Sequence, residues 1–288
     1  MRVGFIGLGS QGAPMARRIL EGGYPTTLWA RRQASVEPFA DTAARIAGSP
    51  AELAAASDLV CLCVVGDADI TEVVTGRAGV LAGLESGGVI AVHSTVHPDT
   101  CRELAARAGD QGVAVVDAPV SGGGPAAARG TLLVMVGGDA DVVARIRPVF
   151  TTYGNPIIHL GPVGSGQLAK LLNNLLFTAN LATARTALAL GEALGIAPEN
   201  LAAVITAGSA NSFALGSIAQ FGGSLDVLKQ VAAGLLHKDV SLVADIAEKA
   251  GVAPGAVLDA ADAALALMDN PRGGRGRTES GPAQFGPA

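Results

Sequence analysis

The sequence is poor in charged residues and has no excess of basic ones. Charged residues make up 16% of the 288 residues, with 20 Lys and Arg against 25 Asp and Glu and a formal net charge of −5. A protein that binds nucleic-acid phosphates needs a basic surface, so this balance argues against nucleic acid as the main partner. Hydrophobic residues reach 49%, many of them alanine, which suits large cores and closely packed helices.

Long apolar runs are also missing. No stretch of about 18 uncharged apolar residues has the flanks of a membrane span. The opening segment, MRVGFIGLGS, has too short an apolar part and too much glycine for a secretory signal. We therefore expect no membrane partner and a cytoplasmic protein. The chain is long enough for two domains.

Cysteine is scarce, with three residues in the whole chain. Cys61 and Cys63 lie two positions apart in an apolar run, so they would point to the same face of a strand. A metal-binding or redox pair is one interpretation of this spacing. The interpretation that we favour is two small core side chains.

Short β-branched runs alternate with helical patterns over the first part of the chain. This alternation predicts an α/β fold with a mostly parallel, doubly wound sheet and helices on both faces. The expected strands are Arg2–Ile6, Thr26–Trp29, Leu59–Val64, Val89–His93, Val113–Asp117, Leu132–Val136 and Pro156–His159.

The pattern changes near Gly161. An Ala- and Leu-rich stretch from about Gln167 to Leu194 predicts one long helix, and no strand is expected after His159. Shorter helices are expected at Pro198–Thr206, Leu236–Ala250 and Ala256–Met268. We therefore predict an α/β domain over residues 1–162 and an all-helical domain, built on the long helix, over residues 163–268.

The last residues, 269–288, are rich in Gly, Pro and Arg. Such a segment cannot bury enough apolar area to order itself, so we expect a flexible tail. The alternative is a contact arm in which Arg272, Arg275 and Arg277 meet an anionic surface or a neighbouring subunit.

A G-x-G-x-x-G motif follows the first expected strand and opens a helical pattern, which is the context that a Rossmann-type dinucleotide site requires. In this motif Gly7 permits the tight turn, Gly9 lets the backbone approach the pyrophosphate, and Gly12 lets helix and strand pack closely. The unpaired N–H groups of the helix N-terminus then face the phosphates. The expected cofactor-binding residues here are Gly7, Leu8, Gly9, Ser10, Gln11 and Gly12.

The second expected strand has no acidic residue near its end. An acid there would hold the ribose 2′-hydroxyl of NAD, whereas this chain has Arg31 and Arg32. Two guanidinium groups suit a 2′-phosphate, so NADP(H) is the favoured cofactor. If these arginines form only a solvated face, the choice between NADP and NAD stays open.

Five motifs in order resemble those of the β-hydroxyacid dehydrogenases, a family that includes 3-hydroxyisobutyrate dehydrogenase and the tartronate, glyoxylate and succinic semialdehyde reductases. The resemblance extends to about Met268. The motifs are GLGSQGAPMA (7–16), STVHPDT (94–100), DAPVSGG (117–123), GPVGSGQLAKLLNN (161–174) and HKDVSL (237–242). The resemblance implies a dinucleotide-binding domain followed by a helical domain, and an oxidoreductase.

The resemblance places the catalytic lysine of the family at Lys170. The residues support this independently, because a lysine among Leu168, Leu171 and Leu172 at a domain junction must be paired, titrated or functional. Desolvation lowers a lysine pKa and so suits proton exchange near neutrality. The alternative is a helix lysine that extends to water. Asn174 lies four residues on, on the same helix face, and by resemblance orients the substrate and the lysine.

The resemblance also assigns substrate and cofactor contacts outside the first motif. Ser121, Gly122 and Gly123 would hold the substrate carboxylate, since glycine N–H groups beside a hydroxyl form an anion-binding nest, although a plain turn is the alternative. Thr95 follows a strand at the edge where such folds bind ligands. The remaining expected cofactor contacts are Val64, Thr95 and Lys238, with Asp239 as a structural neighbour.

Taken together, these features predict hydride transfer between NADP(H) or NAD(H) and the CH–OH carbon of a small β-hydroxyacid or its semialdehyde, with Lys170 handling the proton and no metal. One alternative is an imine reductase-like NADPH enzyme, whose relatives usually lack the lysine. Another is a non-catalytic dinucleotide-binding scaffold. The long apolar helix needs its faces covered, so we expect a homodimer or homotetramer.

Overall fold

The computed structural model describes residues 1–273, so the rest of the expected tail, with Arg275 and Arg277, lies outside the described residues. The chain divides into two compact units, a first unit over Met1–Leu172 and a second unit that begins at Asn173. The division falls inside the long helix α7, Ser165–Ala193. The domain boundary at residues 162–163 lies just before this helix and stays a prediction.

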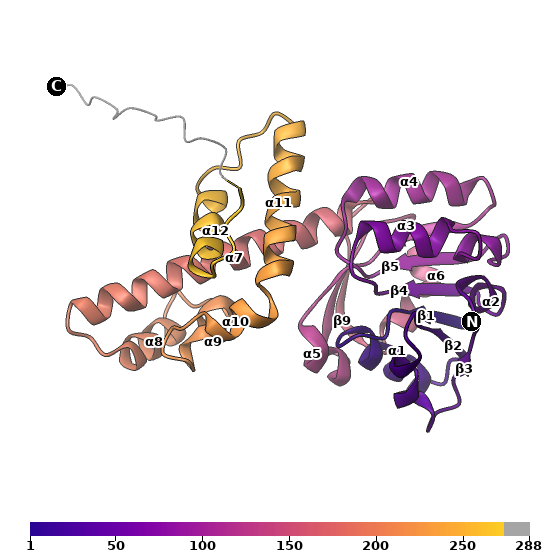
Figure 1. Cartoon of the computed structure of the whole chain (residues 1–288), viewed down its shortest axis with the longest axis horizontal. Helices are drawn as coiled ribbons and strands as arrows, with labels where there is room; N and C mark the ends of the chain where they lie inside the picture. The colour runs from indigo at the N-terminus through magenta and orange to yellow at the C-terminus, as the bar shows by residue number, and fades with distance from the viewer. Residues whose placement is uncertain (274–288) are drawn as a thin grey trace. The chain divides into compact units, whose positions relative to one another are not determined.

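The first unit is built on a six-stranded sheet in the order β3-β2-β1-β4-β5-β6. All neighbouring strands of this sheet are parallel. This is the doubly wound dinucleotide-binding order, and it confirms the predicted Rossmann-type fold (Figure 1). The strands are β1 (Val3–Ile6), β2 (Thr26–Trp29), β3 (Arg45–Ile46), β4 (Leu59–Leu62), β5 (Val89–Val92) and β6 (Ala114–Asp117).

Both faces of this sheet are buried, and neighbouring side chains on a strand enter different cores. On β1, Phe5 joins a core with Met15 and Ile19 of helix α1, whereas Ile6 joins a core with Leu53 and Ile70 of the helices opposite. This two-sided burial explains the short, almost continuously apolar strands. Cys61 is buried in the first of these cores and Cys63 packs against it, as expected of small core side chains.

A single sheet was the expectation, but the structure has two. The last two predicted strands, β8 (Leu132–Val136) and β9 (Gly154–His159), pair with each other and with the short strand β7 (Val120–Ser121) in a separate three-stranded sheet. Strand β7 runs antiparallel to β8, while β8 and β9 are parallel. The two-residue strands β3 and β7 escaped prediction because they have no side-chain periodicity of their own and exist only through pairing.

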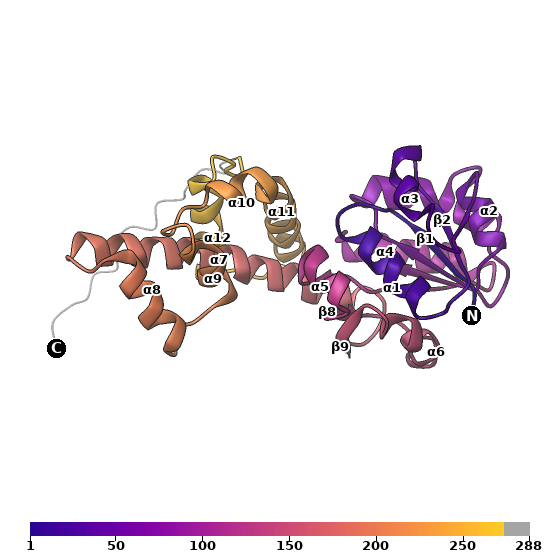
Figure 2. The same cartoon turned by 90° about the horizontal axis from the view of Figure 1, so that it is seen from below.

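The helices follow the predicted pattern closely, with two additions in the second unit. Helix α7 covers the expected long helix, and the shorter helices of the second unit are arranged around it (Figures 1 and 2). Helices α9 and α10 were not expected because each is shorter than about two turns, which is too short to show a clear apolar periodicity. The helices are α1 (Gly12–Glu21), α2 (Pro50–Ala55), α3 (Asp67–Thr75), α4 (Pro98–Gly109), α5 (Gly123–Arg129), α6 (Ala140–Phe150), α7, α8 (Pro198–Ala207), α9 (Phe213–Ala219), α10 (Asp226–Val231), α11 (Ala233–Lys249) and α12 (Ala256–Leu267).

The described start of the expected tail is held on the second unit. The Arg272 guanidinium makes two hydrogen bonds of 2.7 Å to the Asp262 carboxylate of α12, and Asp269 pairs with Lys229. Across residues 1–273, none of the helices has both the length and the apolar character that a membrane crossing needs.

Candidate active site

The three motif glycines each meet a different local requirement. Gly7 has φ +98°, and a Cβ on it would lie 2.2 Å from the Cys63 carbonyl oxygen. A Cβ on Gly12 would lie 1.9 Å from the Gly7 carbonyl oxygen, so helix α1 begins in direct contact with the turn before it. No heavy atom lies within 4 Å of the ideal Cβ position of Gly9, so its backbone faces open space. This open backbone at the start of a helix fits a dinucleotide pyrophosphate.

A pocket of about 340 Å³ lies beside this loop, at the carboxyl ends of β1, β2 and β4. It brings together six of the predicted cofactor residues, namely Gly7, Leu8, Gly9, Arg31, Arg32 and Val64. Trp29 and Ala30 of the β2 end also line it. Ser10 and Gln11 lie in the adjoining turn rather than in the pocket wall, and Ser10 is exposed. The apolar walls and open glycine backbone suit an adenosine moiety at this edge of the sheet.

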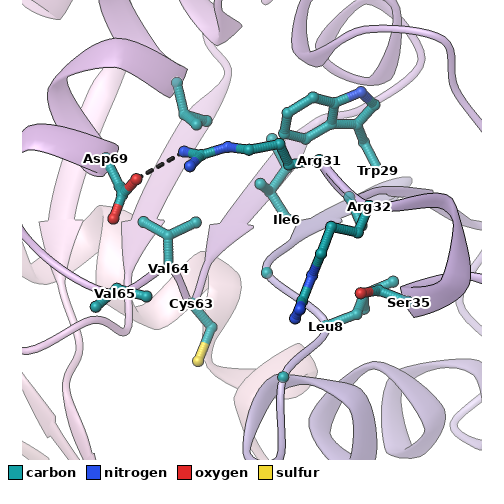
Figure 3. A pocket seen from close by; sticks show the side chains of 14 residues that line it. Ile6, Leu8, Trp29, Arg31, Arg32, Ser35, Cys63, Val64, Val65 and Asp69 are labelled. Atoms are coloured by element: carbon teal, nitrogen blue, oxygen red, sulfur yellow. Dashed lines mark hydrogen bonds and ion pairs between the residues drawn. The ribbon is translucent and has the colours of Figure 1, made fainter.

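The two arginines at the end of β2 have different surroundings. Arg31 donates a hydrogen bond of 2.6 Å to Asp69 of α3, and Glu72 lies 4.0 Å away. Figure 3 shows Arg32 directed away from Asp69, on the side of Leu8 and Ser35. The Arg32 side chain makes no hydrogen bond or ion pair with any residue in the range 1–273.

Asp69 is an ionisable residue of the pocket that the sequence pattern did not reveal. It stands 38 positions from its partner Arg31, so no local pattern connects the two. The signal that could have found it is topological. Because β1, β2 and β4 are parallel neighbours, the segments after β2 and β4 must meet at the same edge of the sheet.

The predicted carboxylate-binding turn lies next to the glycine loop. A Cβ on Gly124, the residue after Gly123, would lie 2.6 Å from the Ser10 carbonyl oxygen. Gly122 and Gly123 both have positive φ, at +125° and +69°, and both are exposed. Ser121 is half-buried at the end of β7. The structure therefore places the residue that follows Ser121–Gly123 against the glycine loop within the first unit.

Lys170 lies on α7, still within the first unit, and is half-buried. Its expected apolar surroundings need correction, because Leu171 is buried whereas Leu168 and Leu172 are 37% and 49% exposed. The start of this helix is fixed by Asp117, whose two carboxylate oxygens accept hydrogen bonds from the Gly164 and Gln167 N–H groups. Burial raises the pKa of Asp117, and these backbone donors oppose that rise.

In the second unit, one carboxylate joins two predicted site residues. Asn174 Nδ2 donates a hydrogen bond of 2.6 Å to Asp239 Oδ2, and Lys238 Nζ lies 2.9 Å from Asp239 Oδ1. Asp239 is 3% exposed, so its charge is compensated chiefly by these partners. The expectation that Asp239 makes structural hydrogen bonds agrees with this arrangement. Thr95 is half-buried in the loop after β5.

Comparison with known proteins identifies the family. Residues 2–161 match the family described as the NAD binding domain of 6-phosphogluconate dehydrogenase. Residues 164–281 match the family described as NAD-binding of NADP-dependent 3-hydroxyisobutyrate dehydrogenase. The 2-(hydroxymethyl)glutarate dehydrogenase of Eubacterium barkeri is 34% identical over 88% of this chain and 84% of its own length. The chain belongs to the β-hydroxyacid dehydrogenase family.

Two further relatives show the same β-hydroxyacid dehydrogenase relationship. An NAD-dependent L-serine dehydrogenase of Pseudomonas aeruginosa is 34% identical over 86% of this chain and 85% of its own length. The structure of Mycobacterium tuberculosis 3-hydroxyisobutyrate dehydrogenase with L-serine superposes with a TM-score of 0.83 at 28% identity, covering 94% of this chain and 95% of that one. The resemblance, the fold and the assignment as an NAD(P)-dependent hydroxyacid dehydrogenase are thus confirmed, while the individual site residues stay predictions.

Proposed function

We propose that this β-hydroxyacid dehydrogenase transfers a hydride between NADP(H), or NAD(H), and the CH–OH carbon of a small β-hydroxyacid or its semialdehyde, with Lys170 as proton acceptor and donor. The observation that carries this proposal is the position of Lys170. Lys170 lies on α7 three residues after Gln167, whose N–H is hydrogen-bonded to the buried Asp117 carboxylate. It also lies four residues before Asn174, on the same helix face.

The residues divide the work between cofactor and substrate. Residues 1–162 form the dinucleotide-binding domain, in which the glycine loop holds the pyrophosphate and Thr95 contacts the cofactor. Lys238 of helix α11 is a further cofactor contact. When bound, the nicotinamide supplies the hydride chemistry. Ser121, Gly122 and Gly123 hold the substrate carboxylate through their N–H and hydroxyl groups, supported by their position beside the glycine loop.

Lys170 and Asn174 act on the reacting oxygen. The Lys170 amine takes the hydroxyl proton as the alcohol is oxidised and returns a proton to the carbonyl oxygen in reduction. The Asn174 amide is oriented by its bond to Asp239, so that its Nδ2 faces the carboxylate. Its Oδ1 accepts a hydrogen bond of 3.2 Å from Asn173 Nδ2 and keeps a second lone pair for another donor. This fixed orientation suits a residue that positions the substrate hydroxyl group next to the Lys170 amine.

The substrate class follows from the chemistry that the relatives share. Their names give 2-(hydroxymethyl)glutarate, L-serine and 3-hydroxyisobutyrate, each of which carries a hydroxymethyl group next to a carboxylate-bearing carbon. We therefore propose a small carboxylic acid of this kind. Arg31 and Arg32 favour NADP(H) over NAD(H) because a 2′-phosphate would lie at the end of β2.

The test is a panel of hydroxymethyl carboxylic acids and their semialdehydes, assayed with both cofactors, followed by Lys170→Ala and Lys170→Arg. Loss of general acid–base catalysis should lower kcat by about 100- to 10,000-fold in both variants, because arginine keeps the charge but does not release its proton. NADPH affinity, measured by nicotinamide fluorescence, should stay close to that of the wild type.

Lys249→Ala is the matched control, because Lys249 is an exposed lysine at the end of α11. It should leave kcat unchanged. Wild-type turnover in Lys170→Ala would overturn the proposed role of the lysine. Silence of the whole panel would favour imine reduction or a non-catalytic scaffold instead.

We also propose that the protein forms a homodimer or homotetramer through the second unit. Its helices expose large apolar side chains, including Leu190, Val204 and Phe213 at 61%, 68% and 81%. Such exposure on several neighbouring elements favours burial against another copy.

A further inference from the structure

The side chain of Gln167 joins two segments of the first unit that are far apart in sequence. It is fully buried. Its Nε2 donates a hydrogen bond of 2.8 Å to the Ser94 carbonyl oxygen, and its Oε1 accepts one of 3.1 Å from the Val96 N–H. Both polar ends of the amide are therefore used by the peptide groups on either side of Thr95. One side chain thus fixes the loop after β5.

The backbone of Gln167 is held equally firmly. Its N–H donates a hydrogen bond of 2.7 Å to Asp117 Oδ2, and the Gly164 N–H donates one of 2.6 Å to Asp117 Oδ1. A Cβ on Gly166 would lie 2.4 Å from the Met135 carbonyl oxygen and 2.9 Å from Asp117 Oδ2. The first turn of α7 is therefore seated directly on the ends of β6 and β8 and has no room to slide.

This anchoring has a consequence for Lys170. It follows Gln167 by three residues, which is about 4.5 Å along the axis of a helix. Gln167 is therefore the connection between the loop that carries Thr95 and the helical turn that carries Lys170. Any change in that connection moves the cofactor-side loop and the proton-transferring group relative to each other.

We propose that Gln167 is a positioning residue for proton transfer, because its amide sets the distance between the Ser94–Val96 loop and Lys170. The inference rests on the proposed role of Lys170. Gln167 is fully buried and both ends of its amide are bonded to this loop, so it acts through the two segments that it joins. An amide is required here because the site demands one donor and one acceptor, both without charge.

An apolar or charged replacement meets opposite difficulties at this position. Leucine fills much of the volume but leaves the Ser94 carbonyl and the Val96 N–H without their partner, so the loop must shift to find another. A carboxylate removes the donor and adds a charge beside buried Asp117. Both replacements are therefore useful probes.

The first test is Gln167→Leu, assayed with the acid that gives the highest wild-type turnover in the panel. A displacement of about 1 Å at the reacting groups is expected to lower kcat by roughly 100-fold. The Kd for NADPH should rise by less than about tenfold, because the shifted loop carries only one of the proposed cofactor contacts. Hydrogen exchange supplies a readout without substrate. The Val96 amide should exchange at least about tenfold faster, because it loses its acceptor.

The matched control is Ser57→Ala. Ser57 is buried in the same unit and donates 2.7 Å to the Leu53 carbonyl oxygen, away from the Thr95 loop. This variant loses one buried hydrogen bond but should keep both kcat and Val96 exchange. If the two variants lose kcat equally, general destabilisation explains the result and the positioning role is wrong.

The second test is Gln167→Glu, because a protonated carboxyl has the same donor and acceptor as the amide. The titratable groups nearby are Asp117 on β6, Cys101 on α4, which bonds to the Gln167 side chain, and Asp67, which acts on Cys101. Burial and the Asp117 charge raise a carboxyl pKa at this position. The kcat of the variant relative to the wild type should therefore rise as the pH falls from about 9 to 6.

The outcomes separate the two proposals. Rescue of turnover by Gln167→Glu relative to Gln167→Leu, at every pH or on acidification, supports the positioning role. A Gln167→Leu enzyme with kcat within about threefold of the wild type, or a glutamate variant no better than leucine at any pH, overturns it. An inactive Lys170→Ala beside a normal Gln167→Leu rejects this inference alone, whereas an active Lys170→Ala rejects the proposed function and the positioning role with it.

Discussion

Arg31 and Arg32 are neighbours of one residue type, yet their surroundings give them different chemistry. The Arg31 guanidinium is engaged by Asp69 and lies near Glu72, which offset much of its charge. An exposed pair of this kind contributes little stability, but it does reduce the attraction of Arg31 for a second anion. Arg32 has no such acid among the described residues, so its positive charge remains available to the pocket.

Arg32→Ala is therefore expected to weaken NADPH binding more than Arg31→Ala. Loss of a guanidinium–phosphate contact should raise the Kd for NADPH by about tenfold or more, while the Kd for NADH stays nearly constant. Fluorescence titration with both cofactors measures this. Arg45→Ala, which removes an arginine paired with Glu52 away from the pocket, is the control. Tighter binding of NADH than NADPH by the wild type would contradict the preference itself.

At the scale of secondary-structure elements, a buried polar chain links the ends of three strands. His93, directly after β5, donates through Nδ1 to the Ala118 carbonyl oxygen at 2.7 Å, beyond the end of β6. Its Nε2 accepts from the Tyr153 hydroxyl at 3.2 Å, just before β9. Both ring nitrogens of His93 thus have protein partners, so neither is free to bind a metal ion.

Burial lowers the pKa of His93 from 6.5 to about 4, although its bond to Ala118 opposes the shift. Between these values the unfolded chain binds more protons than the folded one, so stability is lost as the pH falls from about 6.5 to 4. The complete shift corresponds to roughly 3 kcal/mol of unfolding free energy. Urea unfolding across this range should show the loss, and His93→Gln should flatten it. Equal pH slopes in both proteins would refute this account.

Burial also affects the two thiols that interact with Tyr153. It raises the pKa of Cys63 to about 12 and raises that of the Cys61 thiol further, so both thiols stay protonated near neutrality. Protonated thiols are poor metal ligands and poor nucleophiles. This agrees with the interpretation of Cys61 and Cys63 as core residues.

At the scale of the whole molecule, the proposed self-association is expected to bury the exposed apolar side chains of the second unit. Sedimentation velocity should show a dimer or tetramer, and the double variant Leu190→Glu/Val204→Glu should raise the dissociation constant by more than about tenfold, because two charges would enter an apolar interface. Ile46→Glu is the control, since Ile46 is exposed on β3 of the first unit. A monomeric wild type at micromolar concentration would contradict the proposed assembly.

Much of this architecture could be predicted from local sequence. The seven expected strands all occur, with ends shifted by no more than two residues at either end, because apolar β-branched runs between turns indicate strands wherever they occur. The glycine motif could be located for a similar reason. Its requirements are local and steric, as the clash distances at Gly7 and Gly12 show.

The sequence by itself determined the order of the longer strands and helices, including α7, and the glycine turn, since each depends on residues close together in the chain. Only the tertiary structure decided that β7, β8 and β9 form a separate sheet, that Asp69 engages Arg31, and that Gln167 bonds the loop around Thr95. Each of these depends on residues brought together from distant segments. Their pairing follows from the crossover connections between parallel strands and from the need of buried polar groups for partners, and no local sequence pattern encodes either.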